Sequence, residues 1–323
     1  MTTTSNDDAC DIHIVRTYDA PLQAVWDAWT DPAQVAQWWG PRGFTITTHG
    51  KDLRTGGSWD YTMHGPDGTD YPNTTHYLEV DPLRKLVYDH GASADQPPMF
   101  RVTVLFSWVD GKTLMDMRMH LPTPEAAQQT RGFIRQAGGN ATWDRLAEYL
   151  ARQLRGEERF VINRSFEVPV AVMFDMWTKP EQLARWLAPT GFEMQFMRAD
   201  IRAGGDSFFR MTGPQVTMYA RARYEQVRRP DLLVYTQQFC DEHEQLARHP
   251  MAPTWPATMR TTVTFSEEGP GCTRVTVCWE VADEATSEEM ATFTAGRTGM
   301  TMGWTGSFDK LESVLAERET SGV

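Results

Sequence analysis

The side chains in this 323-residue chain that could do proton chemistry are concentrated in its first half. Six of the eight histidines lie there: His13, His49, His64, His76, His90 and His120. None of them forms an HxH or HExxH pair, the spacings that bring two ligands onto one zinc ion. We therefore expect no metal site, and we interpret these histidines as residues at the solvent-exposed ends of strands.

Acid–base catalysis would need one or two polar groups within reach of a substrate inside a pocket. The candidates are His64, Asp60, Arg54, Tyr61 and Tyr88. The chain has no GxSxG motif for a serine nucleophile, and no GxGxxG or P-loop motif, so no nucleotide cofactor is predicted. The sequence leans against an enzyme, and no catalytic residue is assigned.

A second set of residues favours the binding of a flat or greasy molecule. The chain has 12 Trp and 17 Met, and several of them alternate along predicted strands. Aromatic rings stack and methionine adapts its shape, so both suit such ligands, although they also suit a solid core. The pocket candidates are Trp38, Trp59, Tyr61, Met63, Tyr88, Met117, Met119, Trp143, Trp186, Phe209, Met211, Tyr235, Val277 and Trp279.

These residues belong to two copies of one sequence unit. Residues 14–63 align without a gap onto residues 162–211, and 18 of the 50 positions are identical. Two copies of so long a repeat indicate duplicated domains rather than a solenoid. We predict a disordered lead over 1–11, domains over 12–154 and 160–318, and a linker over 155–159. Asp60 aligns with Phe208 and His64 has no histidine counterpart, so the copies cannot share such chemistry.

The hydrophobic periodicity predicts the elements that position these side chains. A strand over Ile12–Tyr18 precedes two short helices, the first with Pro21 near its first turn, where proline is tolerated. Hairpin strands are then expected over Phe44–Arg54, Ser58–His64, Thr74–Val80, Lys85–His90, Phe100–Trp108 and Lys112–His120. A long helix with Trp143 in its apolar stripe closes the unit. This order is typical of an α+β domain with an antiparallel sheet.

Three segments carry a family resemblance: AVWDAWTDPAQVAQWWGPRGF, DLRTGGSWDY and GPDGTDYP. They resemble the Aha-type branch of the SRPBCC (START-like, helix-grip) superfamily. The resemblance covers nearly all of 12–154 and, more loosely, 160–318, where an insertion lies near Asp241–Pro256. It implies two tandem domains, each with a curved sheet of six to seven strands around a long C-terminal helix and a cavity between them.

The composition limits the partners and the compartment. A net charge of −12 disfavours nucleic acid and anionic membrane surfaces. The four cysteines show no CxxC pair, so free thiols in the cytoplasm are the expected state. No apolar run approaches 18 residues, so no membrane insertion is predicted.

The function predicted is the binding of a hydrophobic or aromatic small molecule in an internal cavity of one or both domains, without a cofactor. Two alternatives stay open. One is a pocket enzyme of the polyketide cyclase or dehydratase kind, and the other, implied by the branch name, is a co-chaperone or stress-response module. The duplication further predicts intramolecular pairing of the two domains, in a monomer or weak homodimer.

Overall fold

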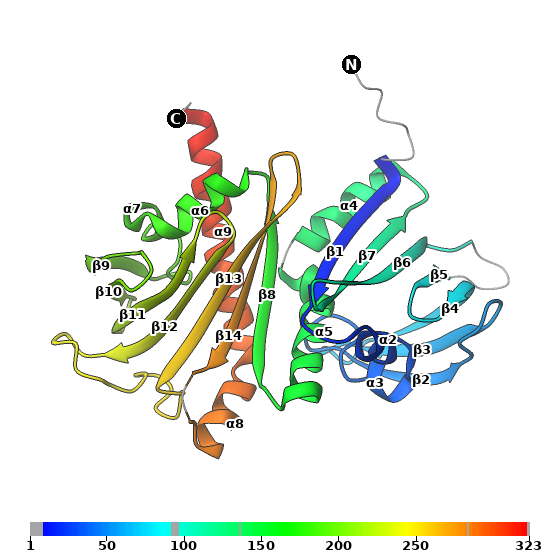
Figure 1. Ribbon diagram of the computed structural model, residues 1–323, viewed down its shortest axis with the longest axis horizontal. Coiled ribbons are helices and arrows are strands. Elements are labelled where there is room, and N and C mark those ends of the chain that lie inside the picture. Colours follow the sequence, from blue (N-terminus) through cyan, green and yellow to red (C-terminus); the bar gives the residue numbers. More distant parts are fainter. Residues whose placement is uncertain (1–8, 92–96, 136, 283, 322–323) are drawn as a thin grey trace. The chain divides into compact units, whose positions relative to one another are not determined.

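The computed structural model describes residues 9–91, 97–135, 137–282 and 284–321 of the chain. It divides into two compact units, Met1–Glu157 and Glu158–Val323, which we call unit 1 and unit 2. Residues 1–8 of the expected lead lie outside the described residues. Each unit is the α+β architecture that the hydrophobic periodicity predicts, one antiparallel sheet with a long helix against one face (Figure 1).

Unit 1 holds a seven-stranded sheet in the order β1-β7-β6-β5-β4-β3-β2. Its elements are β1 (Asp11–Tyr18), α2 (Leu22–Thr30), α3 (Pro32–Val35), β2 (Thr45–Lys51), β3 (Ser58–His64), β4 (Asp70–Asp81), β5 (Lys85–His90), β6 (Phe100–Val109), β7 (Lys112–His120), α4 (Pro124–Arg135) and α5 (Ala137–Arg155). Asp31 separates the two short helices, because its carboxylate accepts hydrogen bonds from the Ala33 and Gln34 amides at the start of α3.

Unit 2 repeats this topology with the sheet order β8-β14-β13-β12-β11-β10-β9. Its elements are β8 (Arg159–Phe166), α6 (Val170–Thr178), α7 (Pro180–Leu183), β9 (Glu193–Ala199), β10 (Asp206–Thr212), β11 (Thr217–Arg228), β12 (Leu232–Cys240), β13 (Thr258–Gly269), β14 (Cys272–Val281), α8 (Ser287–Ala295) and α9 (Arg297–Ser321). The insertion lies between β12 and β13.

The two units share individual hydrogen bonds as well as topology. The Trp38 indole N–H donates to Ala28 O at 2.9 Å, and Trp186 donates to Met176 O at 3.0 Å. The loop after the first strand is held to the last strand in the same way in both copies, because the Thr113 hydroxyl donates to Ala20 O and the Thr273 hydroxyl donates to Val168 O. This repetition of buried contacts supports duplication of a whole domain.

The core of each unit lies between the sheet and the long helix. In unit 1 the Trp29 ring of α2 stacks on the Trp143 ring of α5, with centroids 5.6 Å apart and 13° between the ring planes. In unit 2 Trp177 of α6 stacks on Trp304 of α9 at 5.9 Å and 18°. Stacked aromatic pairs add to the free energy gained by burying their surface, so each pair fixes the helix spacing.

Most of the predicted elements match the structure. Three predicted strands coincide with β3, β5 and β7, and the first strand begins at Asp11 instead of Ile12. The strand predicted over Thr74–Val80 is longer, and that predicted over Phe44–Arg54 is shorter. The helices α4 and α8, which precede the long helix in each unit, were not predicted.

Substitution of Gly205 tests the geometry of the turn before β10, which repeats the turn before β3 in unit 1. A Cβ atom there would lie 2.2 Å from the Asp200 carbonyl oxygen, so Gly205→Ala should lower the free energy of unfolding of unit 2 by about 1–3 kcal/mol. Gly299→Ala is the control, because α9 has open space there and alanine favours helix by about 1 kcal/mol. Urea unfolding measures both changes. A Gly205→Ala protein as stable as the parent would contradict the turn geometry.

Candidate functional site

Unit 2 contains an inner cavity of about 20 Å³ between the sheet and its short helices. It is lined by Trp177, Leu183, Leu187, Met194, Phe196, Phe209, Ala222, Tyr224, Leu233, Tyr235 and Gln237. Leu187, Phe196 and Gln237 are partly exposed, whereas the other lining residues are buried. The cavity therefore extends from the surface into the interior, and its present volume suits about one water molecule.

In unit 1 an indole ring occupies the equivalent space. Trp39 aligns with Leu187, and its ring lies 5.5 Å from Trp29 and 5.3 Å from Trp59. The Trp39 N–H donates to the Tyr61 hydroxyl at 3.2 Å. Because Trp29 and Tyr61 align with Trp177 and Phe209, which line the cavity in unit 2, the Trp39 indole fills the corresponding volume in unit 1.

The pocket candidates from the sequence lie mostly in the core. In unit 1, seven of the candidates belong to the buried cluster: Trp38, Trp59, Tyr61, Tyr88, Met117, Met119 and Trp143. Met63 packs against this cluster. In unit 2, Trp186, Phe209, Tyr235 and Val277 are buried, and Met211 and Trp279 are partly exposed. Of the candidates in unit 2, Phe209 and Tyr235 line the cavity. Burial raises the pKa of Tyr235, so its hydroxyl stays protonated.

Lys51, at the end of β2, is a polar group on the inner face that the sequence analysis missed. Its Nζ donates to Trp29 O at 3.0 Å and lies 3.9 Å from the centroid of the Trp59 ring. Burial lowers the pKa of Lys51 to about 7, and Asp31 opposes this shift. A bulge in β2 between Thr48 and Gly50 explains the omission, because it turns Lys51 to the same face as Trp59.

His90, at the end of β5, is a second inner-face group. Its imidazole stacks on Phe100 with ring centroids 4.7 Å apart. Burial lowers the pKa of His90 to about 4, so the ring is neutral at physiological pH. His90 ends its strand and is partly exposed, as expected for a strand end, but its ring lies on the inner face of the sheet. The alternation Leu86, Tyr88, His90 was the available signal, since Leu86 and Tyr88 are both buried.

Tyr61 and Tyr88 lie in the buried cluster of unit 1, whereas the other candidates for acid–base catalysis lie outside it. His64 contacts the Asp70 carboxylate at 2.6 Å and Thr47 at 2.9 Å. Asp60 accepts a hydrogen bond from Thr74 at 2.8 Å. Strand alternation places both on the outer face of β3, opposite Tyr61. Arg54 forms an ion pair of 2.8 Å with Asp52, and Arg202 repeats it with Asp200 at 2.9 Å, so both arginines stabilise their turn.

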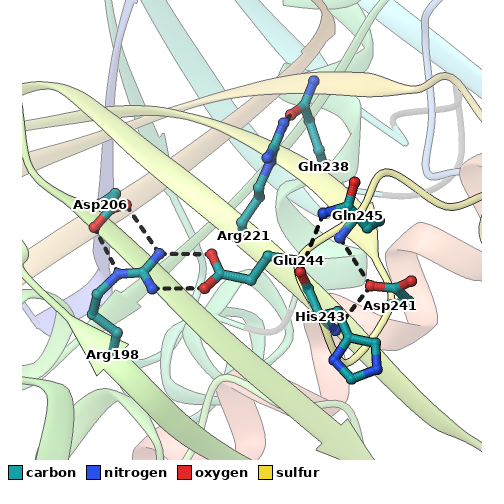
Figure 2. A network of polar contacts seen from close by, with 8 residues as sticks. All are labelled: Arg198, Asp206, Arg221, Gln238, Asp241, His243, Glu244 and Gln245. Carbon is teal, nitrogen blue, oxygen red and sulfur yellow. Dashed lines mark hydrogen bonds and ion pairs between the residues drawn. The ribbon is translucent and has the colours of Figure 1, made fainter.

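An outer cleft of about 380 Å³ lies where the insertion leaves β12. Its lining residues are Thr217, Met218, Tyr219, Phe239, Cys240, Asp241, Glu242, His243, Ala247, Arg248 and Pro250. Figure 2 shows the polar contacts that order this segment, in which the Arg198 guanidinium binds both Asp206 and Glu244. Burial raises the pKa of the Cys240 thiol to about 11, so this cleft holds no reactive thiolate.

Within the described ranges, no group of three His, Cys, Asp or Glu side chains could hold a metal ion. No helix in the described part of the chain has the length and apolar composition needed to cross a bilayer.

One family model matches each of the two units separately. The family model described as Activator of Hsp90 ATPase homolog 1-like protein matches residues 19–151 and, separately, 167–316. A search of curated proteins finds no match.

Similar solved structures include a Mycobacterium smegmatis protein with 22% identity over 49% of this chain and 90% of that chain, at a TM-score of 0.41. A Staphylococcus epidermidis protein has 25% identity over 50% and 92%, also at 0.41. The AHSA1 protein of Silicibacter pomeroyi has 19% identity over 50% and 99%, at 0.39.

The partly buried amine predicts a pH-dependent stability. The folded pKa of Lys51, about 7, lies below that of an unfolded lysine, about 10.4, so between these pH values the unfolded chain binds the extra proton. Stability should rise with pH through this window. Lys51→Met removes the cost of the buried charge and should stabilise unit 1 by about 2 kcal/mol below pH 7, with no gain above pH 10.5. Denaturant unfolding across this range measures the difference, and a difference independent of pH would contradict the assignment.

Proposed function

This chain belongs to the Activator of Hsp90 ATPase homolog 1-like family, and from that premise we propose that unit 2 binds a hydrophobic or aromatic small molecule in its inner cavity. One observation carries the proposal. Leu187 stands where unit 1 has Trp39, and the interior of unit 2 is hollow at the place that the Trp39 indole fills. Unit 1 is then a filled copy with a structural role at this position.

The lining of the cavity indicates the class of ligand. Aromatic rings from Trp177, Phe209 and Tyr235 surround it, and these suit the stacking of a flat ring. The amide of the partly exposed Gln237 offers two N–H donors and a carbonyl acceptor, which would orient a polar substituent. A mostly apolar cavity with a few polar groups is the usual form of a small-molecule site.

The ligand must enlarge the cavity as it binds, because small-molecule sites usually measure 300–1,000 Å³. Leu187 and Met194 are the side chains best able to move, since both are unbranched at Cβ and Leu187 is partly exposed. Displacing these two side chains towards solvent would widen the inner cavity between Phe196 and Phe209. Binding therefore includes a rearrangement of side chains, which favours a slow association rate.

The two alternatives differ in their support. The outer positions of His64 and Asp60 leave unit 1 without these groups inside its sheet, which disfavours a pocket enzyme built on them. The co-chaperone alternative stays a prediction that rests on the family description.

We further propose a cytoplasmic protein whose two units pair within one chain. Free thiols at all four cysteines support the compartment. The duplication itself supports the pairing, since one chain then supplies both copies of the domain. Solution scattering tests the pairing, and an envelope with two separated lobes would contradict it.

Exchanging the residues at the two equivalent positions tests the cavity. The parent protein should bind one molecule of an uncharged fluorophore such as N-phenyl-1-naphthylamine per chain. Leu187→Trp should fill the cavity and weaken binding by roughly tenfold or more, whereas Leu187→Met conserves volume and should retain it. Trp39→Leu should create a second site in unit 1. Fluorescence titration measures both the affinity and the number of sites.

Thermal unfolding of each variant is the control, because a loss of binding counts only where the unit remains folded. If Leu187→Trp binds the fluorophore as tightly as the parent, the ligand does not occupy this cavity. If Trp39→Leu gains no site while remaining folded, the indole is not what closes unit 1.

A further inference from the structure

Lys51 has surroundings that are unusual for a lysine side chain. Its amine is partly buried at the edge of the tryptophan cluster of unit 1, with the Trp59 ring 3.9 Å from Nζ. A hydrogen bond to Trp29 O, near the end of α2, orients the amine. Trp59 is itself held, because its N–H donates to Thr48 at 3.2 Å. The amine therefore lies in a fixed place against an aromatic face.

The face of the Trp59 ring and a carbonyl oxygen, rather than a carboxylate, face the charge of this amine. Among the described residues, no carboxylate forms an ion pair with Lys51, and Asp31 is the acidic group whose field reaches it. Burial lowers the pKa of Lys51 to about 7, so a large share of the side chain is the neutral amine at physiological pH. A desolvated, uncharged lysine is a nucleophile towards carbonyl carbon.

The other lysines provide internal references, because the chain has only five. Lys85 pairs with Glu79 at 2.7 Å and Lys179 pairs with Asp175 at 3.0 Å. Lys112 is exposed at the start of β7, and Lys310 donates to two backbone carbonyls. Position 199, the counterpart of Lys51 in unit 2, is alanine, so this amine is a feature of unit 1 alone.

We propose that Lys51 is a covalent capture site that forms an imine with aldehydes carrying an aromatic ring. The nitrogen lone pair attacks the carbonyl carbon, the nitrogen proton passes to the oxygen, and a second proton transfer releases water as the C=N bond forms. No electrons are gained or lost, and hydrolysis returns the aldehyde. An aldehyde bound to Nζ would place its ring next to the Trp59 indole. Aromatic aldehydes would then gain a stacking contact that aliphatic aldehydes lack. This site is independent of the cavity in unit 2.

Reductive trapping of the full-length protein tests the proposal. Benzaldehyde and sodium cyanoborohydride are added at pH 7, and peptide mass spectrometry measures the benzylation of each lysine. We expect Lys51 to react at least tenfold faster than the exposed Lys112, and this preference to fall to about onefold in guanidinium chloride. Equal rates at Lys51 and Lys112 in the folded protein would overturn the proposal.

Two controls test the role of the surroundings. Lys51→Arg keeps a cation but removes the reactive amine, so the preferred adduct should disappear without transfer to another lysine. Propanal replaces benzaldehyde to test the ligand class, and its preference for Lys51 should be several-fold smaller. If benzaldehyde and propanal prefer Lys51 equally, the site does not select aldehydes with an aromatic ring. If a preferred adduct persists in Lys51→Arg, Lys51 is not the reactive residue.

Discussion

The stacking of one indole on another across two helices is the contact on which each unit depends. Trp29 on Trp143 in unit 1, and Trp177 on Trp304 in unit 2, hold the short helix and the long helix at one spacing. That spacing leaves a volume beneath the helices that a side chain must fill or leave empty. Trp39 of unit 1 is replaced by Leu187 in unit 2, and the neighbouring Trp59 is replaced by Ser207, so two rings of unit 1 have no aromatic counterpart in unit 2.

Because the domain is duplicated, the interior of one copy can be packed for stability while the interior of the other keeps space for a ligand. Unit 1 fills its interior with aromatic surface, which favours stability, and it also tolerates the unfavourable burial of the Lys51 amine. Unit 2 has alanine at that place and keeps the inner cavity of about 20 Å³. An insertion ordered by the Arg198 ion pairs further distinguishes unit 2 (Figure 2). Such divergence between copies of one fold is consistent with a function carried by sites rather than by the fold.

Sequence reasoning reached the architecture because alternation and turn residues determine hairpins locally, as Ser58–His64 and Lys112–His120 illustrate. It missed α4, which has few apolar residues, and α8, although Thr286 and Glu289 form a capping box there. Lys51 was missed because the bulge in β2 reverses the alternation. The cavity could not be predicted, because its size depends on how whole side chains pack rather than on their spacing in the sequence.

The proposed ligand enters the inner cavity of unit 2, whereas Trp39 fills the equivalent volume in unit 1. Native mass spectrometry of the gently purified full-length chain tests this proposal most directly, with the denatured mass as reference. We expect one small apolar ligand per chain, retained from the cell or taken up from an added aromatic compound, and released on denaturation. A chain that remains bare in excess aromatic compound, or one that takes up two ligands equally, would contradict it.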